Sequence, residues 1–205
     1  EDGTFEIEKF EHACRLWTVV LEISVLMAHF PSRQIAELSY RYRTLGLGFA
    51  NIGGMLMSAG LSYDSDEGRA ICGSITAIMT GVSHATSAEM AGELGPFPGY
   101  KPNAKNMARV MRNHRRAAYG ESTGYEKLAV NPVPLVHEEC SDPALPEAAM
   151  RAWDRAIELG EKNGYRNAQR VQQFMDAAPD IAVANDCDAL IRKSPAKFPR
   201  GEKHH

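Results

Sequence analysis

The sequence lacks the features that mark several large classes of protein. Its formal net charge is −3 over 205 residues, which gives no bulk electrostatic attraction for nucleic acid. No apolar run approaches the roughly 20 residues of a membrane-spanning helix, and no basic, apolar and small-residue leader opens the chain. We therefore expect a cytoplasmic protein that contacts neither a membrane nor nucleic acid directly.

Cysteine is scarce and scattered. The four cysteines form no CxxC or CxxxH pair with zinc spacing, so no metal site is expected; they are Cys14, Cys72, Cys140 and Cys187. Reduced thiols are the default for such a chain. Cys14 lies in an apolar helical stripe, where a small buried side chain is favoured over a reactive thiol.

An initial methionine is also lacking. The chain opens at Glu1 and closes with His204 and His205, so we expect a piece of a longer protein that carries remnants of a tag. Hydrophobic residues make up 44% and charged residues 24%, which is typical of a globular chain with one good core or two small ones.

The chain is organised around residues 42–60, which read YRTLGLGFANIGGMLMSAG. A short apolar run containing Gly46 and Gly48 predicts a strand that passes into a helix. The spacing is similar to a dinucleotide fingerprint, but the third glycine is replaced by Asn51, and no acidic residue ends a second strand about 20 residues later. Tight packing of the strand against its own helix is the favoured interpretation.

Helices dominate the rest of the pattern. Residues 5–30 are predicted to form one helix that ends before Pro31, and residues 32–40 a short helix or turn. The acidic residues of the first helix, Glu22 included, lie mainly off its apolar stripe. That stripe holds Phe10, Cys14, Trp17, Leu21 and Val25.

A long helix is predicted from a capped start at residues 63–67 to about Leu94. Small residues on its inner face would let another backbone come close; they are Ala70, Gly73, Ala77, Gly81, Ala85 and Ala88. Four polar residues near its end could line a site, namely His84, Thr86, Ser87 and Glu89. A structural role with internal hydrogen bonds or solvent contact is favoured.

Two more helices follow. Asn103 is predicted to cap a helix that runs to about Tyr119, and Pro146 to open one that ends at Gly164. Residues 120–143 are typical of a surface loop, and residues 165–169 of the beginning of a strand. An arginine cluster stabilises the end of the first of these helices or, alternatively, binds phosphate; it comprises Arg109, Arg112, Arg115 and Arg116.

These patterns predict a helix-rich α/β fold with two to four short strands, and several collinear phrases add a family resemblance. They are LWTVVLEIS at 16–24, YRTLGLGFANIGG at 42–54, ATSAEMA at 85–91, GPF at 95–97, RNHRRAAY at 112–119 and GYRNAQ at 164–169. Over residues 3–169 the chain resembles the catalytic subunit of class II ribonucleotide reductase, the adenosylcobalamin-dependent (vitamin B12-dependent) type.

The resemblance implies that residues 1–169 are part of a ten-stranded α/β barrel, incomplete in this chain, and that residues 170–205 form a divergent, partly disordered tail. It implies radical reduction of ribonucleoside diphosphates or triphosphates, which supplies DNA precursors. The implied cofactor is adenosylcobalamin, and the implied reductant is a thioredoxin-like protein. In the family a finger-loop cysteine carries the radical, a cysteine pair supplies electrons, and a Glu and an Asn assist.

The sequence departs from the family where that chemistry resides. The finger loop and the second redox cysteine would lie before Glu1, and Arg170 to Gln173 stand where a phosphate-binding loop would follow. We assign no catalytic residue and no metal ligand, and expect the chain to be inactive alone. Candidate cofactor-binding residues are Asn51, Gly53 and Gly54 at a strand end, with Ser87 and Glu89.

Two functions stay open. The chain is a segment of an enzyme that works with the remaining segments of the reductase, or it is a non-catalytic scaffold remnant that associates with a complementary chain or with itself. An incomplete barrel leaves open sheet edges and bare apolar helix faces, which favour association.

Overall fold

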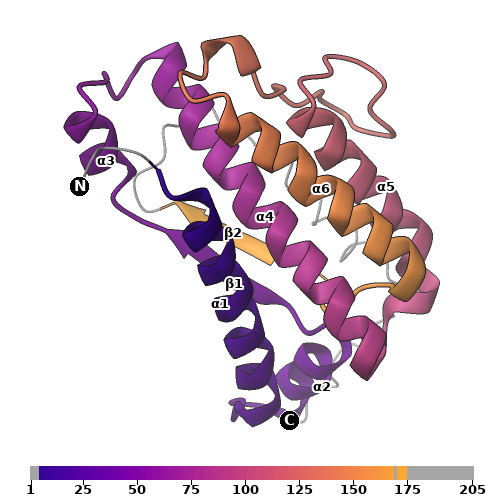
Figure 1. The fold of residues 1–205 in the computed structure, drawn as a ribbon. Helices are drawn as coiled ribbons and strands as arrows, with labels where there is room; N and C mark the ends of the chain where they lie inside the picture. Colours follow the sequence, from indigo (N-terminus) through magenta and orange to yellow (C-terminus); the bar gives the residue numbers. More distant parts are fainter. Residues whose placement is uncertain (1–4, 169, 175–205) are drawn as a thin grey trace, which may run out of the picture.

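The computed structural model describes residues 5–168 and 170–174, and its helices outweigh its strands (Figure 1). In chain order the elements are α1 (Ile7–Met27), α2 (Arg33–Tyr42), β1 (Leu45–Phe49), α3 (Ile52–Ser58), α4 (Asp66–Leu94), α5 (Tyr100–Ala118), the 3₁₀ helix η1 (His137–Glu139), α6 (Ala144–Asn163) and β2 (Arg170–Phe174). The predicted helix-rich α/β class is confirmed. In the described part of the chain, no helix is long and apolar enough to cross a membrane.

The two strands form a parallel pair, although four α-helices and the 3₁₀ helix η1 separate them in the sequence. Leu45 lies opposite Arg170, and Phe49 lies opposite Phe174. Parallel neighbours need a long crossover, which α3 to α6 provide. The predicted passage from a strand at Leu45 into a helix after Asn51 is confirmed.

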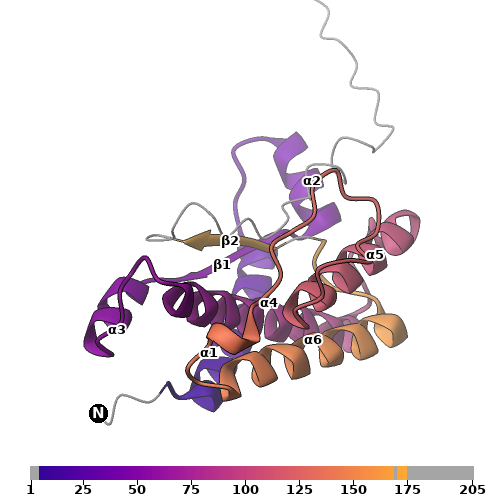
Figure 2. The same ribbon diagram turned by 90° about the horizontal axis from the view of Figure 1, so that it is seen from above.

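Most of the helices lie on one side of this strand pair. Seen from above, α1, α4, α5 and α6 lie on one side, and α2 lies on the other (Figure 2). Leu45 is 4% exposed, and Phe49 meets Phe10 of α1 edge to face at 6.1 Å between ring centroids. Gly46 and Gly48 alternate with these apolar residues and are exposed, so they point away from the helices. The two glycines therefore take no part in helix packing, and the expected tight packing of the strand against its own helix stays a prediction.

The small-residue face of α4 packs directly on α6, as predicted. A Cβ added to Gly81 would lie 2.8 Å from Ala152 Cβ and 3.0 Å from the Ala152 carbonyl carbon. Around this contact lie two buried clusters, one containing Ile75, Ile78 and Leu145, and the other Met107 and Trp153. The absence of side-chain bulk at Gly81 sets how closely the two helices approach.

Replacing Gly81 with alanine is expected to destabilise the chain by about 1 kcal/mol or more, measured by urea unfolding. The overlap with Ala152 costs about 1–3 kcal/mol, and alanine's better helix propensity offsets up to about 1 kcal/mol of it. Gly73→Ala is the matched control on the same helix, because its Cβ would meet only the tip of Leu135 at 3.1 Å. Equal losses in the two variants would contradict this packing.

The inward face of α1 differs from the predicted stripe. Cys14, Thr18 and Glu22 are buried, whereas Trp17 is 57% exposed. Thr18 Oγ1 donates a hydrogen bond to the Cys14 carbonyl at 2.7 Å and lies 3.1 Å from the hydroxyl of Ser83. Polar side chains can occupy this buried face because other parts of the fold provide their hydrogen-bond partners. With this face turned inward, the apolar Trp17 side chain faces outward.

Two predicted boundaries are also wrong. α5 begins at Tyr100, before the predicted cap, and Asn103 lies inside it with Nδ2 donating to the Gly99 carbonyl at 2.8 Å. Residues 165–168 are not a strand, since β2 begins at Arg170. The main chain of these residues forms hydrogen bonds outside any sheet. The Tyr165 carbonyl accepts from Phe97 N, while Arg166 N donates to the Ser87 carbonyl and Ala168 N donates to the Tyr42 carbonyl.

Candidate functional site

The turn after β1 forms the carboxyl end of the parallel pair, which is where ligands gather in barrels and open sheets. Asn51 has a φ of 69°, in the left-handed region that asparagine tolerates better than most residues. Its side chain lies over Gly54, where an added Cβ would fall 2.2 Å from Asn51 Oδ1. An alanine at position 54 would therefore require the Asn51 side chain to move. At Gly53 an added Cβ would make only an ordinary contact with Tyr63, at 3.6 Å.

The five predicted cofactor-binding candidates do not form one site. Asn51, Gly53 and Gly54 share the turn at the carboxyl end of β1. Ser87 lies in a hydrogen-bond network that includes Arg43, just before β1 begins. Glu89 forms ion pairs with arginines of α1 and α6. Cofactor contact through these residues stays a prediction, and the turn is the better-placed group.

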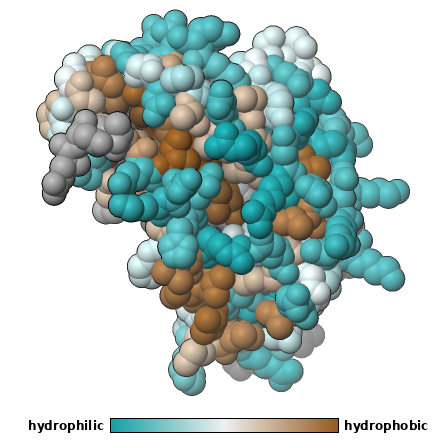
Figure 3. All heavy atoms as spheres, viewed as in Figure 1, coloured by the Kyte–Doolittle hydropathy of each residue, from teal (hydrophilic) through white to brown (hydrophobic). Residues whose placement is uncertain are grey.

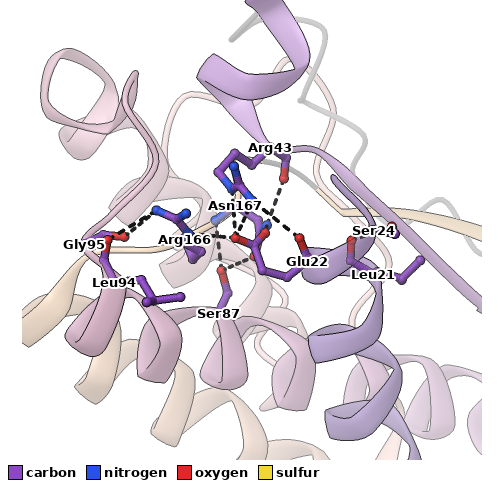
Figure 4. A network of polar contacts seen from close by, with 9 residues as sticks. All are labelled: Leu21, Glu22, Ser24, Arg43, Ser87, Leu94, Gly95, Arg166 and Asn167. Carbon is purple, nitrogen blue, oxygen red and sulfur yellow. Dashed lines mark hydrogen bonds and ion pairs between the residues drawn. The ribbon is translucent and has the colours of Figure 1, made fainter. Parts of the chain in front are cut away.

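A buried polar network joins α1, α4 and the segments that lead into both strands (Figure 4). At its centre is the Glu22 carboxylate, 4% exposed, beside the fully buried guanidinium of Arg43. Arg43 Nε and Nη2 lie 2.8 and 2.7 Å from Glu22 Oε1. The backbone of Arg43 lies in the left-handed region, with a φ of 50°. Its N–H caps the end of α2 by donating to the Ser39 carbonyl at 2.7 Å.

Asn167 completes the network from the β2 side. Its Nδ2 donates to Glu22 Oε2 at 2.7 Å and to the Arg43 carbonyl at 2.9 Å, while its Oδ1 accepts from Ser87 Oγ at 2.8 Å. The Asn167 N–H donates to Ser87 Oγ at 3.0 Å. One amide side chain thus links the chain before β1, the chain before β2, α1 and α4.

The network holds two cations and one anion. Arg166 Nε also donates to Glu22 Oε1, at 2.7 Å, so a single carboxylate faces two guanidinium groups. Arg43 Nη1 is buried and has no hydrogen-bond partner among the described residues. Removing the Glu22 side chain would leave uncompensated buried positive charge. The free-energy cost of that charge is far larger than the net stabilisation that a typical ion pair provides.

The network's position indicates a structural role. It lies where the strands begin, and in parallel barrels that end serves stability while chemistry occurs at the other end. Sequence reasoning missed it because Glu22 was assigned to the outer face of its helix. The apolar run that flanks Glu22 on both sides was the available signal, because an isolated acid in such a run needs a partner.

The other predicted polar groups are internally bonded, as favoured. His84 Nδ1 lies 2.9 Å from the Thr80 carbonyl, and Thr86 Oγ1 donates to the Val82 carbonyl at 2.8 Å. Three of the four clustered arginines pair with carboxylates: Arg112 with Glu126, Arg115 with Asp154, and Arg116 with Glu121. This pairing supports the structural interpretation of the cluster over a phosphate site.

The described cysteines are poor nucleophiles. Burial raises the pKa of the Cys14 thiol to about 12 and also raises the pKa values of Cys72 and Cys140. The interpretation of Cys14 as a small buried side chain is confirmed, while Cys187 lies outside the described residues. Within residues 5–168 and 170–174, no group of His, Cys, Asp and Glu side chains is arranged to hold a metal ion.

A cavity of about 610 Å³ lies between α4, α5 and the loop before α6. His114 and Trp153 line it, and their rings stack with centroids 5.0 Å apart. The His84 ring also stacks on Trp153, with centroids 5.6 Å apart. The walls are mainly apolar, and Asn113, a polar exception, is already bonded to the main chain of Glu126.

The stability of the chain is expected to fall as the pH drops below about 6.5. Burial lowers the pKa of His114 to about 4, whereas the unfolded imidazole titrates near its ordinary value of about 6.5. The unfolded state therefore binds more protons in this window, which costs up to about 2 kcal/mol between pH 7 and pH 5. Urea unfolding of wild type and His114→Phe at both pH values measures the difference. An identical pH dependence would contradict the neutral, buried imidazole.

Comparisons with known proteins identify the fold family. The family model described as "Ribonucleotide reductase, barrel domain" matches residues 1–179. The chain belongs to the ribonucleotide reductase family. It is 67% identical over 183 residues to the vitamin B12-dependent ribonucleotide reductase of Agrobacterium fabrum, covering 89% of this chain and 14% of that protein. The corresponding enzyme of Bradyrhizobium diazoefficiens is 62% identical over 184 residues, covering 90% of this chain and 14% of that protein.

A more distant relative fits the same pattern. The vitamin B12-dependent ribonucleotide reductase of Rhodopirellula baltica is 40% identical over 191 residues, covering 92% of this chain and 16% of that protein. The family resemblance is thus confirmed, and the chain corresponds to one segment of a much longer reductase. The division at residue 169 stays a prediction; β2 covers residues 170–174, and the family match runs to residue 179.

Proposed function

We propose that this chain builds one segment of the catalytic barrel of a vitamin B12-dependent ribonucleotide reductase, a cytoplasmic enzyme that makes deoxyribonucleotides for DNA synthesis. The observation that carries the proposal is the 67% identity to the Agrobacterium fabrum reductase across 89% of the chain. The geometry is compatible with it. Parallel strands have their main helical cover on one side, and β1 presents only Gly46 and Gly48 on the other, where backbone or ligand can approach closely.

The chain's own contribution is to position strands. Glu22, Arg43 and Asn167 hold the starts of β1 and β2 together, and the α4–α6 packing supports the pair from one side. Because the start of β1 is fixed, the position of the turn at Asn51, at the carboxyl end of the same strand, is fixed as well. In the full-length enzyme, this turn would border the reaction centre.

Adenosylcobalamin is the cofactor proposed for the full-length enzyme, where it would supply the radical that starts the reaction. We expect the described residues not to make a site for it alone, because the turn after β1 offers one amide side chain beside glycine backbone. The cofactor site would then be assembled mainly by other parts of the reductase, with Asn51, Gly53 and Gly54 at its edge.

The proposed substrates of the full-length enzyme are ribonucleoside diphosphates or triphosphates, and the proposed reductant is a thioredoxin-like dithiol protein. This chain alone is expected to reduce neither class of nucleotide, since its described thiols are buried and have raised pKa values. The chain is assayed with adenosylcobalamin, CDP or CTP and dithiothreitol, with the Agrobacterium reductase as positive control. Formation of deoxyribonucleotide by the chain alone would overturn its assignment as a supporting segment.

A spectral titration with adenosylcobalamin tests the edge position of the turn. Weak or undetectable binding is expected from a sample that melts cooperatively. Saturable, tight binding that is lost in Asn51→Ala would contradict the proposal that other segments supply most of the site.

A further inference from the structure

An uncharged apolar surface runs along the outer side of α1. We call it the outer α1 stripe, and it comprises Leu16, Trp17, Val20, Ile23 and Met27, which are 53%, 57%, 42%, 49% and 74% exposed. These positions recur at steps of one, three, three and four residues, so they share one side of the helix. That side is opposite to the buried Cys14, Thr18 and Glu22.

The stripe carries no charge along its length. From Leu16 to Met27 the sequence contains one charged residue, Glu22, and that residue is turned into the buried network. Outer faces of helices on globular proteins ordinarily carry charged and polar residues. Three helical turns without an exposed charged side chain indicate a surface that is covered in the functional protein.

Exposed apolar side chains also occur on α2. Ile35 and Leu38 of α2 are each 45% exposed. In Figure 3, hydrophobic side chains gather in the lower part of the molecule, where Figure 1 places α1 and α2. Both helices thus expose apolar side chains toward this end of the molecule.

The size of the stripe indicates that its partner is a single helix. Twelve helical residues span about 18 Å, and a helix is about 10 Å wide. The stripe is therefore one helix wide and about three turns long, which is the footprint of a single packed helix. A helix of the same polypeptide can use so small a surface, because it loses no translational freedom on docking. The stripe also has no Lys or Arg, which membrane-surface helices use to contact lipid headgroups.

The relatives are long enough to contain such a helix outside the segment that this chain matches. The chain covers only 14% of the Agrobacterium reductase, so most of the polypeptide lies outside it. We propose that the outer α1 stripe is the docking surface for an amphipathic helix of the same reductase polypeptide from outside residues 1–205. This inference rests on the proposed function and names a partner for that barrel segment.

The test uses a full-length chimera in which residues 1–168 of this chain replace the matching segment of the Agrobacterium reductase. The photoreactive amino acid p-benzoylphenylalanine replaces Trp17, and the matched control carries it in place of Val130, an 81% exposed loop residue. Irradiation of the Trp17 variant is expected to give an intramolecular crosslink to a helical peptide from outside the replaced segment. A second variant with the photoreactive residue in place of Met27 is expected to mark the same helix.

The outcomes separate the inference from the proposed function. A folded chimera that makes deoxyribonucleotides but gives no more crosslinking at positions 17 and 27 than at position 130 overturns the inference alone. A crosslink that joins two copies of the chimera assigns the stripe to a second copy and also overturns it. A folded chimera that gives the expected crosslink but shows no turnover counts against the proposed function and leaves the docking helix in place.

Discussion

Replacing Glu22 with alanine is expected to lower the free energy of unfolding by about 3–5 kcal/mol, the usual loss when one partner of a buried ion pair is removed. The change would leave the guanidinium groups of Arg43 and Arg166 facing each other without an anion. It would also remove one of the two acceptors of Asn167 Nδ2. Urea unfolding followed by circular dichroism measures the loss.

Glu37→Ala is the matched control, because Glu37 also pairs with an arginine but lies at the surface. Its side chain is 64% exposed and that of Arg33 is 91% exposed, so the loss should stay below about 1 kcal/mol. Should Glu22→Ala abolish folding, Glu22→Gln keeps one acceptor and serves as the milder probe. Equal losses for Glu22→Gln and Glu37→Gln would contradict the central place given to this carboxylate.

Replacing Trp153 with alanine is expected to cost about 3–5 kcal/mol, as for other large buried aromatic side chains. Trp153 is 1% exposed and stacks with the rings of both His84 and His114. It also lines the cavity of about 610 Å³, so its loss would enlarge a void that already exists. Thermal or urea unfolding reports the change.

The chain's second tryptophan supplies the control. Trp17 is 57% exposed on α1, so Trp17→Ala should change the stability of the isolated chain by less than about 1 kcal/mol. The tryptophan fluorescence of the two variants distinguishes the buried ring from the exposed one. A large loss from Trp17→Ala would mean that α1 is already covered in the isolated chain.

Local sequence signals were enough for much of this fold. Ser65 begins α4 as a side-chain cap, and Gly164 ends α6 with a φ of 73°, both at predicted places. The small residues of α4, Gly81 among them, predicted its close packing on a neighbouring helix. These features depend on residues a few positions apart, where backbone preference and periodicity decide the outcome.

Features that depend on distant residues could not be predicted in the same way. Glu22 meets Asn167, which is 145 positions away, so neither residue's pattern reveals the pair. That contact turns α1 so that Trp17 faces outward and Glu22 inward, against the order that hydrophobicity alone indicates. It also explains why residues 165–168 bond to helices and loops instead of opening a strand.

The candidate site shows the same limit. The turn at Asn51 was predicted because it follows an apolar run with glycines, and the structure places it at the carboxyl end of β1. Ser87 was singled out as a polar residue at the end of a small-residue face. Its partner Asn167 lies 80 positions away, so its role in holding the strands became visible only in three dimensions.

Turnover by the chimera tests the central claim most directly. With residues 1–168 of this chain in place of the matching segment, the Agrobacterium reductase is expected to make deoxyribonucleotides at a rate close to its own when adenosylcobalamin and a dithiol are supplied. The Glu22→Ala chimera should lose stability and turnover together. A wild-type chimera that folds and binds adenosylcobalamin but makes no deoxyribonucleotide would contradict the assignment of this chain to the reductase barrel.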